Sequence, residues 1–249
     1  MIYGKYCANG NDFLITTAFH GADRGRLAKK VCDRYYGAGA DGLIVLLPRV
    51  DYDFAWEFYN ADGSHAAMCG NGARAAALYA FHNGLGGAEQ RFMTGAGAVS
   101  AKIYANGVVE AQLTEYKIAR ENIKEYGATW QLIEVGVPHL ITNGRLSIFD
   151  RFPLSDLRYK YDANISVYSV RNRAIRVRTF ERGVESETLA CGTGMAACYI
   201  SAFNAKKIAS PCIVYPRSGE KVTCSIVDSR VRIKGKVVKL FDAVFGDNI

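Results

Sequence analysis

The chain has 249 residues, of which 49% are hydrophobic and 22% charged, and its formal net charge is +7. This composition is that of an ordinary globular protein and excludes a disordered or collagen-like chain. No stretch approaches the roughly 18 apolar residues of a membrane-spanning helix, and no apolar run near Met1 suits a secretory signal. We therefore expect a cytoplasmic protein with no membrane partner.

The cysteines, histidines and basic residues show which kinds of binding site the sequence does not predict. An odd number of cysteines, seven, without a secretory signal is typical of reduced thiols. No Cys-x-x-Cys pair occurs and the four histidines lack ligand spacing, so the sequence predicts no metal site. The densest basic stretch, 230–239, largely alternates basic with apolar residues, as in a strand with one solvated face. No nucleic-acid module accompanies it, so we expect no nucleic-acid partner.

Short segments, mostly rich in β-branched or aromatic residues, dominate the chain and predict strands. In the first half these strands are 11–17, 42–47, 53–60, 98–104 and 108–113. A surface helix is expected over 22–35. In the second half the strands are 131–135, 174–180, 212–215, 221–226 and 230–234. Between Leu113 and Gln131 the chain is polar, and this stretch is the expected connector between two domains.

Two segments nearly half the chain apart are near copies of each other. Cys69-Gly-Asn-Gly and Cys191-Gly-Thr-Gly each lead into a run of small and apolar residues, which ends at Phe81 and at Phe203. A helix that is apolar on nearly every face is buried on nearly every face. Each half is therefore expected to wrap a strongly curved sheet around a central helix, with the cysteine at that helix's N-terminus.

Further landmarks repeat in the same order. Gly10-Asn11-Asp12-Phe13 matches Gly136-Val137-Pro138-His139, and Asn60 and Arg182 each end an apolar stretch at the same distance before a cysteine. The period is too long for a solenoid, whose repeats run roughly 20–50 residues. The sequence therefore predicts an α+β fold of two pseudo-symmetric domains, each a curved, barrel-like and mainly antiparallel sheet wrapped round a central helix.

The duplicated motif suits a specific chemistry. A helix N-terminus carries unpaired N–H groups and partial positive charge, which favour a thiolate and can hold a carboxylate. If both helix ends point at one cavity, a substrate α-carbon lies between two sulfurs. That arrangement is a two-base stereoinversion site that needs no cofactor. His139 could assist a thiol as acid or base, and Glu181 with Arg182 could bind the ammonium and carboxylate of a zwitterion.

Together these segments resemble the diaminopimelate epimerase family. The resemblance is carried by residues 60–74, by Gly10-Asn11-Asp12-Phe13 and by residues 181–194, and it spans residues 9 to about 203. It implies an isomerase that interconverts LL- and meso-diaminopimelate without a cofactor, on the route to lysine and peptidoglycan. It also implies a homodimer whose last strand returns to the first domain. The expected domains are then residues 1–115 with 238–249, and residues 116–237.

The resemblance also implies roles for individual residues. Cys69 and Cys191 would be the two acid/base thiols, with His139 and Glu181 as their polar helpers. The distal, non-reacting head of the substrate would be read by Asn11, Asn60, Asn164, Glu181 and Arg182. The reacting carboxylate would be held by the backbone N–H groups of Gly70, Asn71, Gly192 and Thr193.

Two departures from the family pattern leave an alternative open. Val137 stands where much of the family has asparagine, and the loop 183–187 is one residue longer than the commonest pattern. The alternative is a related two-cysteine racemase that acts on another amino acid, such as histidine. The retention of Asn60, Asn164 and Arg182 favours a substrate with two amino-acid heads. A basic binding module or a thiol redox protein would leave the matched motifs unexplained.

Overall fold

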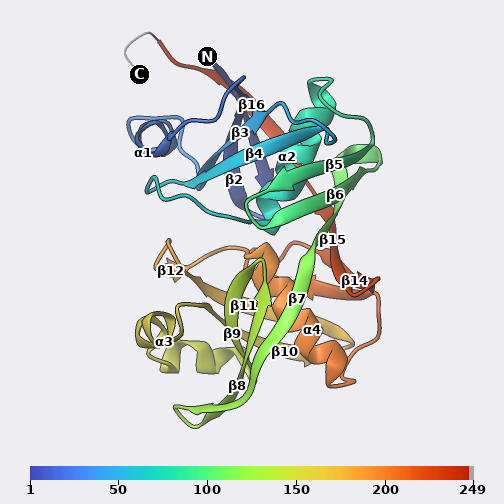
Figure 1. Ribbon diagram of the computed structural model, residues 1–249. Coiled ribbons are helices and arrows are strands. Elements are labelled where there is room, and N and C mark those ends of the chain that lie inside the picture. The colour runs from blue at the N-terminus through green and yellow to red at the C-terminus, as the bar shows by residue number, and fades with distance from the viewer. Residues whose placement is uncertain (247–249) are drawn as a thin grey trace. The chain divides into compact units, whose positions relative to one another are not determined.

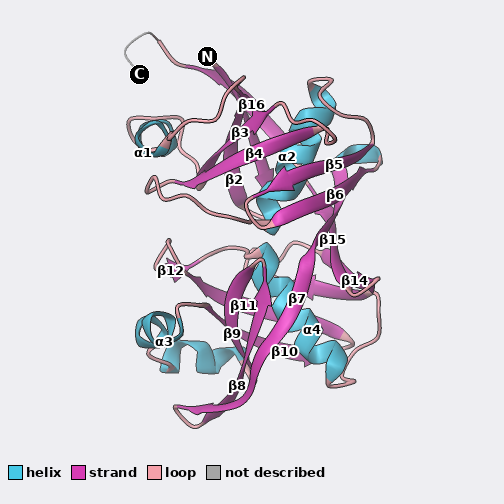
Figure 2. Cartoon of the chain, viewed as in Figure 1, coloured by secondary structure: helices cyan, strands magenta, loops and turns pink. Residues whose placement is uncertain are grey.

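The computed structural model describes residues 1–246, so the end of the predicted 238–249 segment, residues 247–249, lies outside the described residues. The chain divides into two compact units. Unit 1 comprises Met1–Ala111 and the C-terminal segment from Gly235, and unit 2 comprises Gln112–Lys234. Strands dominate both units (Figures 1 and 2).

Unit 1 is a single curved sheet with one helix inside it and one outside. Its strands are β1 (Ile2–Ala8), β2 (Asn11–Thr17), β3 (Gly42–Leu47), β4 (Phe54–Asn60), β5 (Glu89–Thr94), β6 (Gly97–Ile103), the start of β7 (Val108–Glu125) and β16 (Val238–Val244). Its helices are α1 (Gly25–Cys32), α2 (Gly70–His82) and the short 3₁₀ turn η1 (Ala105–Gly107). The strand order is β6-β5-β4-β3-β2-β1-β16, and the N–H of Val237 donates to the carbonyl of Gly107 just before β7.

Unit 2 repeats this plan and closes its sheet into a barrel. Its strands are β7, β8 (Ala128–Val135), β9 (Val137–Asn143), β10 (Asn164–Arg171), β11 (Ala174–Glu181), β13 (Cys212–Tyr215), β14 (Val222–Val227) and β15 (Arg230–Lys236), and the short β12 (Ser186–Glu187) pairs with β11. The helices are η2 (Leu146–Arg151), α3 (Leu154–Tyr161) and α4 (Gly192–Asn204). Pairing of β15 with β7 joins the two ends of the sheet.

The same succession of pairings occurs in both units. In unit 1 the pairs β1–β2, β3–β4 and β5–β6 are antiparallel, whereas β2–β3 and β4–β5 are parallel. In unit 2 the pairs β8–β9, β10–β11 and β13–β14 are antiparallel, whereas β9–β10 and β11–β13 are parallel. Each parallel pair is joined by a helical crossover, as parallel strands require. The α+β, barrel-like fold expected from the sequence is confirmed.

The central helices are buried because their side chains are small. Every residue of α2 from Gly70 to Ala80 is buried, as is every residue of α4 from Gly192 to Ala202. Within its unit, α2 contacts β1, β2, β3 and β6, and α4 contacts β8 to β11 and β13. The alanines in both helices permit this close approach, since larger side chains would push the strands outward.

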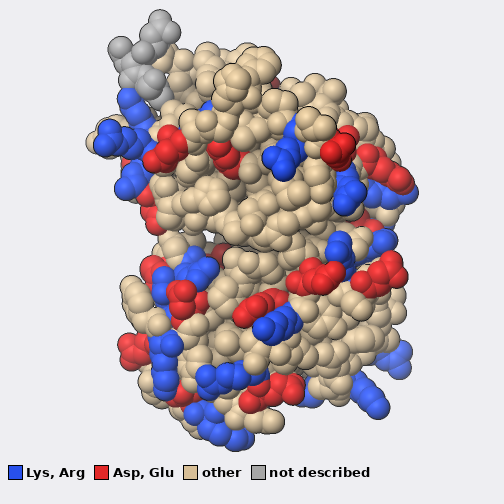
Figure 3. Space-filling view, viewed as in Figure 1, with Lys and Arg blue, Asp and Glu red and all other residues tan. Residues whose placement is uncertain are grey.

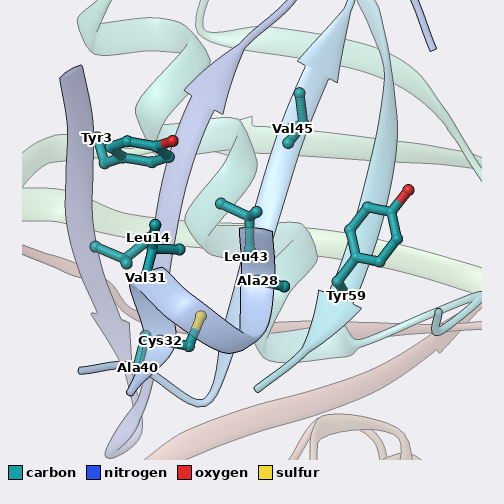
Figure 4. Close-up of a cluster of buried hydrophobic side chains, with 9 residues drawn as sticks. All are labelled: Tyr3, Leu14, Ala28, Val31, Cys32, Ala40, Leu43, Val45 and Tyr59. Atoms are coloured by element: carbon teal, nitrogen blue, oxygen red, sulfur yellow. The ribbon is translucent and has the colours of Figure 1, made fainter. Parts of the chain in front are cut away.

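A second helical layer covers the other face of each sheet. In unit 1, α1 packs Ala28, Val31 and Cys32 onto Leu14, Leu43 and Val45 (Figure 4). In unit 2, η2 and α3 bury Phe149 and Leu157 against Leu140, Ile165 and Val167. Strands covered on both faces lose the alternating pattern, which explains the continuous apolar run of β3 and the unbroken burial of residues 164–168 in β10.

The structure corrects two sequence expectations. The polar connector predicted between Leu113 and Gln131 is instead the far end of β7 and the start of β8, which form an antiparallel hairpin. Its polar side chains are the exposed rows of that ribbon. The predicted surface helix over 22–35 is shorter, since α1 spans Gly25–Cys32 and turns follow it.

The basic stretch near the C-terminus has the predicted alternation. Val231 and Ile233 of β15 are buried, while Arg230 and Arg232 are partly exposed. Arg230 pairs with Glu115 at 3.0 Å. On the face drawn in Figure 3, lysine and arginine lie interspersed with aspartate and glutamate over each unit.

Candidate active site

Cys69 is the N-cap residue of α2. Its backbone is extended (φ −147°, ψ 119°), and its sulfur accepts a hydrogen bond from the N–H of Gly72 at 3.3 Å. This N–H is one of the donors that a helix leaves unpaired in its first turn. The contact favours negative charge on sulfur, as does the positive end of the helix dipole. The sequence prediction that the thiol stands at a helix start is confirmed.

The third residue after each cysteine is a glycine with little room for a β-carbon. A β-carbon at Gly72 would lie 3.3 Å from the Cys69 β-carbon and 3.2 Å from Ile44. At Gly194 it would lie 3.0 Å from the Thr179 hydroxyl, 3.2 Å from the Cys191 β-carbon and 3.3 Å from the Cys191 sulfur. The sequence analysis assigned the glycines to close approach of a ligand. At Gly72 and Gly194 the geometry adds another cause, because the cysteine side chain itself occupies the space.

Asn11 and Asn71 meet at the sulfur of Cys69. The Cys69 thiol donates to Oδ1 of Asn11 at 3.7 Å, and Nδ2 of Asn71 donates to the same oxygen at 3.3 Å. Nδ2 of Asn11 donates to Oδ2 of Asp41 at 2.7 Å. Asn11 therefore lies beside the thiol in this structure, at a position that sequence reasoning assigned to the distal head.

Arg74 is a member of the site that sequence reasoning missed. It is fully buried, and its guanidinium donates to Oδ1 of Asn71 and to Oδ1 of Asn9, each at 2.6 Å. Its Nε also donates to the carbonyl of Gly70 at 3.4 Å. A charge is rarely buried without partners of this kind. Arg74 fixes the first turn of α2, from which the backbone N–H groups of Gly70 and Asn71 project.

Asn60 lies at the end of β4, on a tight polar turn. Its Nδ2 donates to the hydroxyl of Ser64 at 2.9 Å, and that hydroxyl donates to Asp62 at 2.6 Å. Asn60 pairs in register with Gly42 of β3. The structure thus places Asn60 at a strand end of unit 1, held by its own turn rather than by Asn11 or Cys69.

Cys191 is the N-cap residue of α4 in unit 2. Its backbone is also extended (φ −109°, ψ 111°), and it is 7% exposed. Its sulfur lies 3.7 Å from the hydroxyl of Thr193. Thr193 and Gly192 form the first turn of the helix and are buried. Cys191, Gly192 and Thr193 thus repeat the helix-end arrangement of Cys69, Gly70 and Asn71.

Other cysteines lie in surroundings that keep them as thiols. Burial raises the pKa of Cys32 to about 12. It also raises the pKa of Cys198, which lies inside α4, and that of Cys212 on β13. These residues behave as small apolar side chains, so they serve as matched controls for the two helix-end cysteines.

His139 is fully buried on β9. Burial lowers its pKa to about 3, and the nearby charge of Arg182 acts in the same direction. Neither ring nitrogen has a hydrogen-bond partner among residues 1–246. A buried imidazole with two unused nitrogens is costly to leave unpaired. The neutral ring is therefore available to take or give a proton when a partner arrives.

Asn164, Glu181 and Arg182 come together with His139 at one end of the unit 2 sheet. Asn164 begins β10, pairs in register with His139, and donates to the carbonyl of Pro138 at 3.1 Å. Its Oδ1 accepts from the N–H of Arg182 at 2.9 Å. Glu181, at the end of β11, accepts a hydrogen bond from the hydroxyl of Thr188.

The guanidinium of Arg182 is partly exposed and is held by Asp162. It donates to the backbone carbonyl of Asp162 at 3.1 Å and to its carboxylate at 2.9 Å. The side chain is 31% exposed. Asp162 and Thr188 are further residues that sequence reasoning missed, since no pattern links them in sequence to the positions they hold.

Strand register refines the match between the two halves. Asn60 stands opposite Gly42, the partner of Phe13. In unit 2 the ladder that pairs Ile165 with Phe180 brings Glu181 opposite Asn164. Glu181 rather than Arg182 is therefore the counterpart of Asn60. The longer loop before Cys191 accounts for the difference of one residue.

Comparison with known proteins decides the family. Residues 3–118 match the family model described as diaminopimelate epimerase. The chain is 50% identical over 240 residues to a diaminopimelate epimerase of Nitratiruptor sp., covering 96% of each protein. It is 47% identical to a diaminopimelate epimerase of Campylobacter jejuni, covering 98% of each. The chain belongs to the diaminopimelate epimerase family. Its class of activity is therefore that of an isomerase.

Solved structures confirm the fold of this family member at much lower identity. A hydroxyproline epimerase from Agrobacterium vitis, crystallised with trans-4-hydroxy-L-proline, superposes with a TM-score of 0.76 at 13% identity. The match covers 98% of this chain and 91% of that one. Within residues 1–246 of the chain, no helix is both long and apolar enough to cross a membrane. No group of three or more His, Cys, Asp or Glu side chains in the same range is arranged to hold a metal ion.

Proposed function

We propose that this chain interconverts LL- and meso-diaminopimelate, with Cys69 and Cys191 as the two acid/base groups. One sulfur begins as thiolate and removes the proton from the α-carbon. The other begins as thiol and returns a proton to the opposite face. The roles exchange when the reaction runs backwards. The observation that carries the proposal is the matched placement of the two cysteines as N-cap residues of buried helices in two units of the same topology.

The helix ends supply the electrostatic part of the mechanism. Removal of the α-proton leaves negative charge that spreads onto the substrate carboxylate. The N–H groups of Gly70, Asn71, Gly192 and Thr193 bind that carboxylate at the positive ends of α2 and α4. Within each unit the helix holds these donors in place, so they need not reorient as the charge develops. We propose that no metal or organic cofactor takes part.

The polar groups of unit 2 complete the site. His139 is neutral and buried, with neither ring nitrogen hydrogen-bonded to any described residue, and it acts as a proton-transfer helper. Glu181 accepts from the substrate ammonium, and Arg182 binds the distal carboxylate by its two-pronged guanidinium. Asn60 and Asn164 complete the recognition of the non-reacting head, whereas the Asn11 amide acts at the Cys69 thiol. A racemase acting on histidine, the alternative, is not favoured, because curated relatives at 47–50% identity are named for diaminopimelate.

We further propose that the protein is a cytoplasmic homodimer on the route to lysine and peptidoglycan. The support for a dimer is β16, the edge strand of unit 1. Its apolar side chains stay exposed, including Leu240 at 52% and Phe241 at 45%. A long apolar edge strand is a surface that proteins normally cover.

The decisive test is solvent-deuterium exchange over a panel of amino acids. Purified protein is incubated in deuterium oxide with LL-diaminopimelate, L-histidine, L-proline or L-lysine, and α-deuteration and stereochemistry are followed by NMR and chiral chromatography. We expect deuterium incorporation and meso product with diaminopimelate alone. Racemisation of another member of the panel, with diaminopimelate unchanged, would overturn the substrate assignment while leaving the family intact.

A further inference from the structure

Asn11 joins a carboxylate to the Cys69 sulfur. One end of its amide, Nδ2, donates to Oδ2 of Asp41 at 2.7 Å. The other end, Oδ1, lies 3.7 Å from the Cys69 sulfur and 3.3 Å from Nδ2 of Asn71. Three residues distant in sequence thus form a chain of contacts that ends at the thiol.

The chemistry of Asp41 fixes which way the amide points. An ionised carboxylate only accepts hydrogen bonds, so the NH₂ group of Asn11 must face it. The carbonyl oxygen then faces Cys69, where the thiol S–H is its donor. Asn71 reinforces this orientation, because Arg74 occupies its Oδ1 at 2.6 Å and its Nδ2 is turned to Asn11. Reversing the Asn11 amide would place two oxygens together at Asp41 and two NH₂ groups together at Asn71.

We propose that Asp41 is a positioning residue which acts through Asn11 to keep a hydrogen-bond acceptor on the Cys69 sulfur and so favour its thiol form. This inference rests on the proposed two-thiol function and deepens it. A hydrogen bond to the protonated form of a group stabilises that form. The helix end and the Gly72 N–H favour the thiolate form of Cys69, whereas the Asn11 carbonyl favours its thiol form. A residue that acts alternately as acid and base must be able to adopt both forms.

Other charges around this chain of contacts come from three further elements. Arg34, after α1, donates to Oδ1 of Asp41 at 2.8 Å and to Oδ1 of Asp12 at 3.0 Å. Lys5 of β1 pairs with Asp12 of β2 at 2.8 Å. Arg74 of α2 binds Asn71. Burial opposes ionisation of Asp12, but hydrogen bonds from Arg34 and Lys5 outweigh it and lower its pKa. Arg34 thus binds both Asp41 and Asp12. Only Asp41 of these two carboxylates accepts a hydrogen bond from the Asn11 side chain.

Unit 2 has no amide at the position that matches Asn11. Val137 replaces Asn11, and its side chain offers neither donor nor acceptor. The hydroxyl of Thr193 lies beside Cys191 instead, and a hydroxyl can turn to serve thiol or thiolate. The influence of Asp41 therefore belongs to Cys69 alone.

The test measures how the alkylation rate of Cys69 depends on pH, residue by residue, with iodoacetamide and peptide mass spectrometry. In Asp41→Asn the new amide can donate to Asn11, which releases the Asn11 NH₂ group to face sulfur. We expect Cys69 to react about tenfold faster at pH 6.5, the change that one unit in thiol pKa produces, while Cys191 is unaffected. Asp41→Ala removes the acceptor without adding a donor, so we expect a smaller change in the same direction.

Two controls separate positioning from charge and from folding. Asp12→Asn removes a neighbouring negative charge but not the contact with the Asn11 side chain, so its Cys69 rate should stay within about twofold of wild type. In an Asn11→Leu background, Asp41→Asn should have no further effect, which is the signature of action through Asn11. Melting curves check that each variant is folded.

An unchanged Cys69 rate in Asp41→Asn and Asp41→Ala would overturn the proposal. So would an equal effect of Asp12→Asn, or an effect of Asp41→Asn that persists in the Asn11→Leu background. Alkylation uses no substrate, so these outcomes are independent of whether the protein epimerises diaminopimelate.

Discussion

Gly194 packs directly against Cys191, so that a β-carbon on the glycine would lie 3.3 Å from the catalytic-candidate sulfur. At its counterpart Gly72 the corresponding contact is with the Cys69 β-carbon, at 3.3 Å. The glycine three residues after each cysteine therefore leaves room for the cysteine side chain.

Gly194→Ala should crowd the Cys191 side chain and the Thr179 hydroxyl, which the added β-carbon would approach to 3.0 Å. Overpacking of this kind costs typically about 1–3 kcal/mol, and misplacement of a reacting group lowers the rate further. We expect at least a tenfold loss of kcat together with a lower melting temperature. Gly87→Ala is the matched control, because its β-carbon would meet only the Glu89 carbonyl at 3.9 Å. Wild-type kcat in Gly194→Ala would contradict the steric argument.

Cys69→Ser and Cys191→Ser should each abolish epimerisation without loss of fold. A serine hydroxyl is scarcely ionised near neutral pH and cannot replace a thiolate base. Each variant keeps one thiol, so each should still exchange or eliminate from one face, with complementary stereochemical preference. Cys198→Ala, on the same helix as Cys191, is the control. Near-parental epimerisation by either serine variant would end the two-thiol assignment.

His139 should make the protein less stable in acid. Its folded pKa of about 3 lies below the unfolded value of about 6.5. Between these values the unfolded chain binds a proton that the folded chain does not, so stability falls as pH drops through this window. His139→Gln removes this proton uptake. We expect its urea midpoint to fall less than that of wild type between pH 7.5 and 5.0, whereas variants of the exposed His20 should follow wild type. Parallel curves for His139→Gln and wild type would refute the prediction.

Leu240→Glu should dissociate the proposed dimer. A charge introduced on the exposed face of β16 would be buried without a partner on association. We expect the dissociation constant to rise at least tenfold by analytical ultracentrifugation. Val50→Glu, an equally drastic change at an 82% exposed residue between β3 and β4, should leave it unchanged. A wild-type protein that sediments as a monomer at micromolar concentration would exclude the interface.

Prediction from sequence succeeded where side-chain size or pattern reflects local surroundings. The runs of small and apolar residues after both cysteines predicted buried helices, and residues 11–17 and 42–47 were predicted with the observed bounds. The strand β5 was missed because two of its inward-facing residues, Gln90 and Thr94, are polar. Its sequence therefore lacks the alternation of apolar and polar residues that identifies a strand. The continuation of β7 beyond Leu113 was missed because its pairing with β8, not its apolar content, makes it a strand.

The candidate site was predictable only in its duplicated part. Cys69, Cys191 and the residues next to them repeat, and repetition is visible in a sequence. Asp41 and Arg74 do not repeat and act through partners far along the chain, so their importance appears only with the fold. The one available signal was Arg74 itself, a charged residue inside a run of small apolar ones in a helix expected to be buried.

The return of β16 to β1 has a consequence for biosynthesis. Unit 2 is continuous in sequence, so all its strands are synthesised before β16. Unit 1 begins first but lacks its edge strand until β16 emerges. The half that is translated first is therefore completed last, and the exposed edge of β1 must stay unpaired through most of synthesis. Deletion of β16 would therefore leave β1, the first strand synthesised, without its partner.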